Sequence, residues 1–284
     1  MPEQLAESQV RRPAPALRDA VAHYVGYRLE GFAPGLHRGL PSRHLTFIIS
    51  VGDPIVVVEQ ADPRQGPDRY STVMGGFQDS SAVIAHNGTQ EGVAIELTGQ
   101  GCRMLLGRPA SDLWKTSVEA GDVVGRVGVE LWERLQATTG WDRRFAICDE
   151  ILGRLLQPML PNRPELWEAW RLIESSNGTV AVADIAAEVG WSRRHLTTSF
   201  DREFGFSPKV AARVIRFERA RRLLQAADRP SIATVAADCG YYDQSHLTRD
   251  FVDLAGMAPG EWLAAESASI EPATAQELVA LTAS

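Results

Sequence analysis

The chain has 284 residues, of which 44% are hydrophobic and 23% charged, and its formal net charge at pH 7 is −7. These proportions are typical of a soluble globular protein with one or two domains and a substantial core. The sequence contains no apolar run near the roughly 20 residues of a membrane span and no signal-peptide pattern at its start, so we expect a cytoplasmic protein with no membrane partner.

The first hundred residues predict mostly strands. Residues 1–15 are polar and predict a loose lead-in, and the apolar spacing over 17–27 predicts a short helix running into a strand. β-Branched runs and alternating apolar residues then predict further strands at 45–49, 55–58, 71–76, 81–86 and 92–98. Short strands at this spacing, separated by Gly, Asp and Asn, indicate a compact β-barrel or sandwich.

The pattern becomes helical after Gly101. Ser111 to Trp114 resembles a helix start, and 127–138 and 142–157 carry apolar residues at helical spacing on either side of Gly140, which predicts an αα-hairpin. Three prolines follow within 158–164, and a helix cannot easily continue through them. We therefore expect an N-terminal domain over 1–160, rich in strands to about 100 and helical over 101–160.

The stretch from Val182 to Trp262 contains the same pattern twice. Each copy predicts a short helix, a glycine turn and a second helix, so Gly190 corresponds to Gly240 and Leu196 to Leu247. Ser192 and Asp243 are the expected N-caps of second helices over about 192–204 and 243–253, and a helix over 209–227 joins the copies. Two helices joined by a tight turn make a helix-turn-helix, whose second helix fits the major groove of DNA.

The predicted second helices each have an apolar side and a polar side. Leu196, Phe200 and Phe204 face the core in the first, and Leu247 and Phe251 in the second. The polar residues left to face outward are Arg193, Arg194, Thr197 and Thr198 in the first helix and Gln244, Ser245, Thr248 and Arg249 in the second. Arginine suits guanine, glutamine suits adenine, and threonine methyls can meet thymine, although surface exposure alone would also explain such residues.

The charge is unevenly distributed along the chain. Residues 191–230 contain ten Lys and Arg against four Asp and Glu, a local excess of six positive charges in an acidic protein. Such a segment indicates a nucleic-acid contact, with a solvated arginine-rich helix face as the alternative.

Residues 165–263 resemble the AraC/XylS family of transcription regulators. The resemblance rests on Ala186, Gly190, Ser192-Arg-Arg-His-Leu196, Phe200, Gly205-Phe-Ser-Pro208, Arg216 to Leu224, Gly240-Tyr, Asp243-Gln-Ser-His-Leu247, Arg249, Phe251 and Gly256-Met-Ala-Pro259. It implies a bipartite DNA-binding domain of seven helices, whose two recognition helices enter successive major grooves about 34 Å apart.

The resemblance also implies roles for individual residues. Base contacts fall on Arg194, Thr197 and Thr198 and on Gln244, Ser245, Thr248 and Arg249, while His195 and His246 are expected to pack or to contact phosphate. Two departures stand out: Thr198 replaces a common Arg, and Trp262 stands near where a Tyr-Arg pair often closes the domain.

The N-terminal half is similar, more weakly, to the β-barrel sensor domains that often precede this module. The segment Gly101 to Trp114 carries that likeness, which implies ligand sensing or dimerisation. The expected partners are double-stranded DNA, with RNA polymerase, a small-molecule effector and a second copy of the chain as further candidates.

Catalytic and metal chemistry find little support in the sequence. Cys102, Cys148 and Cys239 lie far apart and predict buried thiols, not a disulfide framework or a zinc site. The histidines of the N-terminal half are scattered, and no nucleophile elbow, P-loop or dinucleotide-binding motif occurs. We expect no catalytic residue, metal or cofactor, and we do not expect the protein to be an enzyme. Two alternatives stay open: an enzymatic or purely dimerising N-terminal domain, and C-terminal helices that engage a protein instead of DNA.

The expected fold class is α+β. A β-barrel or sandwich with an αα-hairpin fills 1–160, an all-α bipartite helix-turn-helix domain fills 161–265, and 266–284 form a flexible tail.

Overall fold

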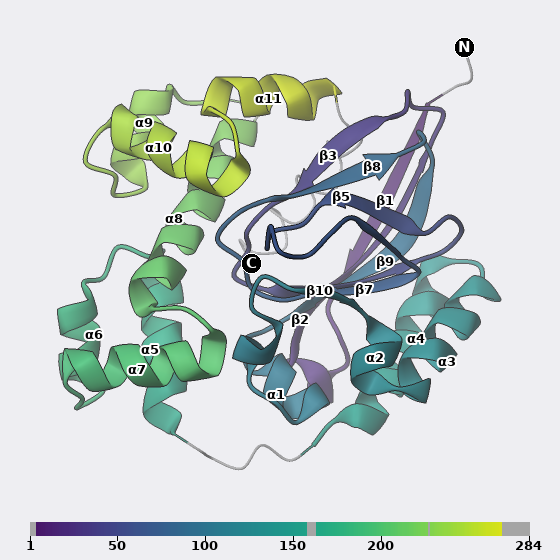
Figure 1. Ribbon diagram of the computed structural model, residues 1–284, viewed down its shortest axis with the longest axis horizontal. Coiled ribbons are helices and arrows are strands. Elements are labelled where there is room, and N and C mark those ends of the chain that lie inside the picture. Colours follow the sequence, from purple (N-terminus) through teal and green to yellow (C-terminus); the bar gives the residue numbers. More distant parts are fainter. Residues whose placement is uncertain (1–3, 158–162, 227, 269–284) are drawn as a thin grey trace.

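The computed structural model describes residues 4–157, 163–226 and 228–268. Strands predominate up to Leu97, helices and one further strand at Ser117–Glu119 follow, and only helices occur from Pro164 onward in the described residues (Figure 1). The expected α+β class, with a strand-rich N-terminal part and a helical C-terminal part, is confirmed. In the described ranges, none of the helices is long and apolar enough to cross a membrane.

Two antiparallel sheets form the N-terminal part. The larger has the order β1 (Leu5–Arg11), β2 (Val21–Glu30), β9 (Gln90–Leu97), β4 (Leu45–Ser50), β7 (Thr72–Gly75) and β10 (Ser117–Glu119). The smaller has the order β3 (Gly35–Gly39), β8 (Ala82–His86), β5 (Ile55–Glu59) and β6 (Asp68–Tyr70). Val93, Ile95 and Leu97 alternate along β9 and are all buried, as the two-residue period of a strand requires.

The beginning of the chain differs from its expected form. The predicted loose lead-in contains β1, which pairs with β2 from Leu5 opposite Glu30 to Arg11 opposite Tyr24. The helix expected from residue 17 is limited to a 3-10 turn at Pro15–Leu17, and β2 begins at Val21. Both predictions were wrong because pairing with a distant strand, not local side-chain pattern, satisfies the backbone here.

Helices cover one side of the larger sheet. They are α1 (Gly101–Leu106), a 3-10 turn at Ala110–Leu113, α2 (Ala120–Val124), α3 (Arg126–Gln136) and α4 (Trp141–Leu155). The predicted αα-hairpin corresponds to α3 and α4, and it packs so closely that a Cβ on Gly26 of β2 would lie 2.4 Å from the Trp141 ring. The helix expected to start at Ser111 is only that 3-10 turn, because Trp114 is non-helical and Lys115 has a φ of 57°.

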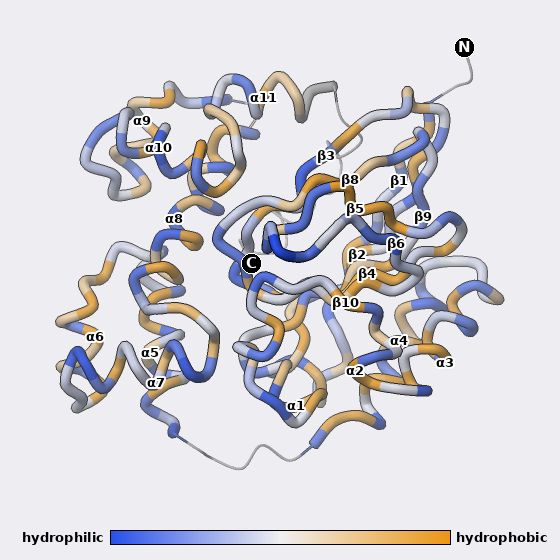
Figure 2. The backbone as a smooth tube through the Cα atoms, viewed as in Figure 1, coloured by the Kyte–Doolittle hydropathy of each residue, from blue (hydrophilic) through white to orange (hydrophobic). Residues whose placement is uncertain are grey.

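Seven helices form the described C-terminal part. They are α5 (Pro164–Ser175), α6 (Val182–Glu188), α7 (Arg193–Phe204), α8 (Pro208–Gln225), α9 (Ile232–Asp238), α10 (Gln244–Ala255) and α11 (Pro259–Ala268). Figure 1 shows α8 running between a group formed by α5, α6 and α7 and a second group formed by α9, α10 and α11. Hydrophilic and hydrophobic residues alternate along these helices (Figure 2).

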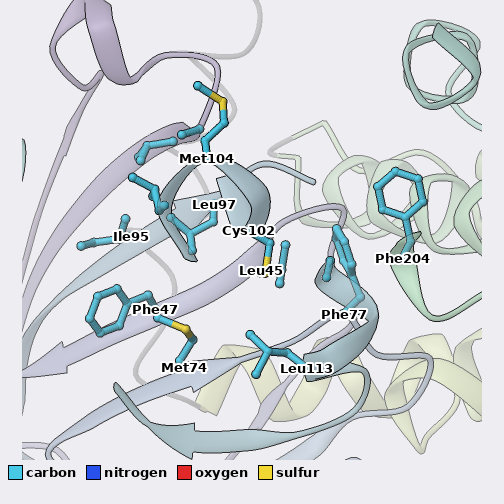
Figure 3. Packing of buried hydrophobic residues seen from close by; sticks show 14 of the residues in the cluster. Leu45, Phe47, Met74, Phe77, Ile95, Leu97, Cys102, Met104, Leu113 and Phe204 are labelled. Atoms are coloured by element: carbon cyan, nitrogen blue, oxygen red, sulfur yellow. The ribbon is translucent and has the colours of Figure 1, made fainter. Parts of the chain in front are cut away.

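Aromatic residues join the N-terminal sheets to the first helical group. The Phe77 ring lies 5.3 Å from Trp170 of α5 and 5.2 Å from Phe206, centroid to centroid, and it packs edge-on against Phe204 of α7. Figure 3 shows Phe204 reaching toward Phe77 at the margin of the buried cluster. The core therefore continues across the boundary expected at the prolines, of which 158–162 lie outside the described residues.

The expected tail begins within a helix. Helix α11 extends to Ala268, three residues into the segment 266–284, and residues 269–284 lie outside the described part of the chain.

Candidate nucleic-acid interface

Helix α7 is capped at both ends and held to the core by one side. The Ser192 hydroxyl accepts a hydrogen bond from the His195 amide at 3.2 Å, which satisfies one of the free N–H groups of the first turn. Gly205, with a φ of 87°, ends the helix in the left-handed conformation. Leu196 and Phe200 are fully buried, so the opposite side of the helix is fixed toward solvent. The exposed residues on it include Arg193, Arg194, Thr197 and Thr198.

Helix α10 repeats this construction. The Asp243 carboxylate accepts a hydrogen bond from the His246 amide at 2.7 Å, and Leu247 and Phe251 are fully buried. Gln244, Ser245 and Arg249 are exposed and Thr248 is half-buried. The Arg249 guanidinium bonds the Ser245 carbonyl at 3.3 Å and so lies along the outer side of the helix.

The two histidines differ in their surroundings. The His195 ring is exposed and meets the Trp191 ring edge-on at 4.5 Å. His246 is half-buried, lies perpendicular to the Tyr241 ring at 5.2 Å, and accepts a hydrogen bond from the Tyr242 amide at 3.5 Å. His246 therefore takes part in packing the second turn, and the imidazole edge used in that bond cannot also meet DNA.

Part of the basic excess of 191–230 has a structural use. Arg213 of α8 donates to Asp250 of α10 at 2.7 Å and also pairs with Asp253, two acids that lie outside the basic segment. Arg216 donates to the Gly178 carbonyl at 2.8 Å. The local charge excess of 191–230 therefore overstates the number of cations left for DNA, because sequence counting cannot reveal partners that folding brings in from elsewhere.

Tyr242 is a surface residue that the sequence reasoning missed. Its side chain is 93% exposed, and it stands immediately before the N-cap Asp243 at the outer end of α10. The signal was available, because the second copy has one more residue than the first between its turn glycine and its N-cap. Its exposure beside the N-terminus of α10 places it among the candidate contact residues.

The histidines and cysteines of the chain do not form a metal centre in the described residues. His23 and His44, expected to be scattered, both approach the Glu96 carboxylate, at 3.5 and 3.3 Å. No group of three or more His, Cys, Asp or Glu suited to a metal occurs in the part of the chain that the structure describes. The cysteines are buried free thiols, and burial raises the pKa of Cys102 to about 12 and of Cys239 to about 11.

Two capped helices, each with a buried apolar side and exposed polar residues at its beginning, define a helix-turn-helix DNA-binding protein. Comparison with known proteins agrees with this class, since residues 185–265 match the family model described as a helix-turn-helix domain. YbfI of Bacillus subtilis (strain 168), an HTH-type transcriptional regulator, is 34% identical over 233 residues, which are 79% of this chain and 80% of YbfI.

Two solved structures are also similar. An AraC-type transcriptional regulator from Chromobacterium violaceum is 32% identical, covering 36% of this chain and 91% of its own, with a TM-score of 0.33. ToxT from Vibrio cholerae O395 is 13% identical and covers 90% of this chain and 96% of its own, with a TM-score of 0.50, a likeness of fold. The chain belongs to the AraC-type family of helix-turn-helix transcriptional regulators, and its activity is that of a DNA-binding transcription regulator.

Proposed function

We propose that α7 and α10 are recognition helices that enter successive major grooves on one face of the DNA. The observation that carries this proposal is the arrangement common to both helices. Each buries a leucine and a phenylalanine on its inner side, Leu196 and Phe200 in α7 and Leu247 and Phe251 in α10. Each exposes polar residues in its first turn, and these differ between the copies: Arg193 and Arg194 in α7, Gln244 and Ser245 in α10. A recognition helix inserts its N-terminal turns into the major groove, where their side chains contact base edges and discriminate between base pairs.

The contacts proposed for each helix follow from its exposed residues. The set comprises Arg193, Arg194, Thr197 and Thr198 of α7 and Gln244, Ser245, Thr248 and Arg249 of α10. We add Tyr242, whose exposed hydroxyl can donate to a phosphate beside the groove that α10 enters. Because the two sets differ, the preferred site is asymmetric.

Selection of bound sequences from a random double-stranded library tests this proposal, followed by anisotropy titration of the selected site at several salt concentrations. We expect two conserved blocks about one helical turn apart and an affinity that falls steeply with salt, as phosphate contacts require. Arg171→Ala, on α5, is a suitable control, because Arg171 pairs with Glu168 on its own helix and lies outside both recognition helices. A library that yields no enriched sequence would overturn the proposal.

For the N-terminal part we propose small-molecule sensing. A cavity of about 310 Å³, the size of a small-molecule site, is lined by polar groups that include Tyr27, Arg69 and Gln90. A second cavity of about 90 Å³ adjoins it at Ile55 and is bordered by Ser42, whose hydroxyl bonds Glu218 of α8 at 2.9 Å. A ligand that extended into this second cavity would meet Ser42 and so reach the contact that holds the linker helix.

Filling the space between the sheets tests the sensing proposal. The functions of the genes next to the bound DNA suggest candidate effectors. We expect one of these small molecules to change the affinity of the wild-type protein for its DNA site. Ile55→Trp should abolish that response and leave binding to the selected site intact, because Ile55 borders both cavities and lies far in sequence from either recognition helix. A response that survives in this variant would place the effector elsewhere.

The proposed role as a transcription regulator also implies a cellular location and two further partners. Binding to chromosomal DNA would place the protein in the cytoplasm, and contact with RNA polymerase and homodimerisation through the N-terminal domain (1–160) follow from the family resemblance. Sedimentation equilibrium across a concentration series tests the dimer, and a single species of 31.1 kDa throughout would contradict it.

A further inference from the structure

The two helix-turn-helix units have separate hydrophobic cores that share one helix. Ala211, Ala212 and Ile215 of α8 belong to the core of the first unit, and Phe217 and Leu224 to that of the second. The placement of α10 relative to α7 therefore depends on the stiffness of α8 and on whatever contacts cross directly between the units.

One crossing contact joins the turn before α6 to the turn before α10. Gly178, in the first of these turns, lies so close to α8 that a Cβ there would stand 2.2 Å from the Ala212 carbonyl oxygen. A Cβ on Gly240, in the second turn, would stand 2.9 Å from Cγ2 of Thr179. The turn glycine of the first unit, Gly190, has no atom within 4 Å of its Cβ position. The turn glycine is thus open to solvent in the first unit, whereas in the second unit it packs against the first unit.

Arg216 of α8 lies between these two turns. Its Nη1 donates to the Gly178 carbonyl oxygen at 2.8 Å, and its guanidinium carbon stands 5.6 Å from the centre of the Tyr241 ring. Gly178 belongs to the first unit and Tyr241, 5% exposed, to the second. These two contacts hold the guanidinium between the units.

A cation held by a carbonyl oxygen on one side and a ring face on the other fixes both partners. The carbonyl bond is directional and the cation–π contact weakens as the ring moves away, so a rotation of the second unit about α8 would break one of them. The contacts of Arg216 therefore make α8 more resistant to bending and twisting at the junction of the two cores than a single helix would be.

We propose that Arg216 is a positioning residue that sets the spacing between the two DNA blocks that the protein accepts. The inference rests on the proposed two-groove binding and concerns the distance between the blocks, not their sequence. Each base pair inserted between the blocks moves the second by about 3.4 Å and turns it by about 35° around the DNA axis. A protein with a fixed α7–α10 relation must reject such a shift, and one with a loose relation can follow it.

The test measures affinity for the selected site and for versions with one base pair added or removed between the blocks. We expect wild type to prefer the selected spacing by about tenfold or more, and Arg216→Ala to prefer it by about threefold or less, since the two lost contacts together have the size of a tenfold factor. Affinity for either block alone should be the same in both proteins. Arg216→Lys, which keeps a donor and a charge, should restore part of the preference.

Two further variants make the test specific. Tyr241→Leu removes the ring and keeps an apolar side chain in the second core, so it should loosen the spacing preference as Arg216→Ala does. It tests the inference independently if Arg216→Ala fails to fold. Arg221→Ala removes an arginine from the same helix, away from Gly178 and Tyr241, and should keep the wild-type spacing preference.

The outcomes separate this inference from the proposal beneath it. A selected site with a single block would overturn two-groove binding, and the spacing inference with it. A two-block site whose spacing preference persists in Arg216→Ala and Tyr241→Leu would leave two-groove binding intact and show that α8 alone sets the distance.

Discussion

Glu218 offers a test of how firmly the linker helix is held by the N-terminal domain. Its carboxylate accepts hydrogen bonds from the Ser42 hydroxyl at 2.9 Å, from the Arg43 amide at 3.0 Å and from Arg43 Nε at 2.5 Å. The side chains of Glu218 and Arg43 are only 13% and 22% exposed. The contact joins residues about 175 positions apart and ties α8 to the loop before β4.

The substitution Glu218→Gln keeps the shape of the side chain and removes its charge. The amide retains one oxygen, so about one charge-assisted hydrogen bond is lost and the half-buried guanidinium loses its counter-ion. We expect the free energy of unfolding to fall by about 2–3 kcal/mol, between the cost of one charged hydrogen bond and that of breaking a buried pair.

Urea unfolding followed by tryptophan fluorescence, at neutral and acidic pH, measures the effect. Burial by itself raises the pKa of Glu218, but the charges of Arg43 and His44 and the hydrogen bonds from Arg43 outweigh burial and hold the pKa below the ordinary glutamate value. The stabilisation is therefore fully present above the unfolded pKa of about 4.5 and is lost as the pH falls through the lower folded pKa. The difference between wild type and variant should be constant at pH values above the titration of His44, whose charge also faces Glu218, and it should shrink as the pH falls through the folded pKa of Glu218.

Glu168→Gln provides the matched control. Glu168 pairs with Arg171 within α5, both side chains are well exposed, and water screens the pair, so stability should not change measurably. Equal stability of wild type and Glu218→Gln at pH 7, or a difference that persists at a pH where Glu218 is protonated, would refute the account of this contact.

The remaining predictions concern DNA affinity, turn conformation and thiol reactivity. Arg249→Ala should weaken binding to the selected site by about 1–3 kcal/mol and relax base preference at one position, whereas Arg194→Ala should cost less; the reverse order in anisotropy titrations would show the ranking to be wrong. Gly205→Ala should lower the free energy of unfolding more than Gly190→Ala. Both positions have positive φ, which costs about 1 kcal/mol with alanine, but only a Cβ on Gly205 meets another side chain, at 2.7 Å. Equal urea midpoints of the two variants would contradict this. Burial raises the pKa of Cys102 to about 12, so the native protein at pH 8 should leave this thiol unmodified by iodoacetamide, and rapid alkylation detected by mass spectrometry would disprove its burial.

Local signals were sufficient wherever a structural feature depends on neighbouring residues. Ser192 and Asp243 were expected as helix caps, and each accepts a hydrogen bond from an amide three residues later. The strand runs at 45–49 and 55–58 became β4 and β5 because β-branched residues suit a buried sheet whatever their partner. In contrast, β1 was missed, because its polar residues form a strand only by pairing with β2.

The sequence by itself determined the repeat, the caps and which side of each second helix is left exposed, because helix periodicity and capping act over three or four positions. The tertiary structure alone decided which charges remain available. Arg213 and Arg216 have the same appearance in the sequence as Arg193 and Arg194. Folding, however, places Arg213 beside acids of α10, and Arg216 between a carbonyl and a ring that come from two turns. Contacts between residues tens or hundreds of positions apart, such as that of Arg43 with Glu218, depend on the packing of whole elements, and no pattern within one element can reveal them.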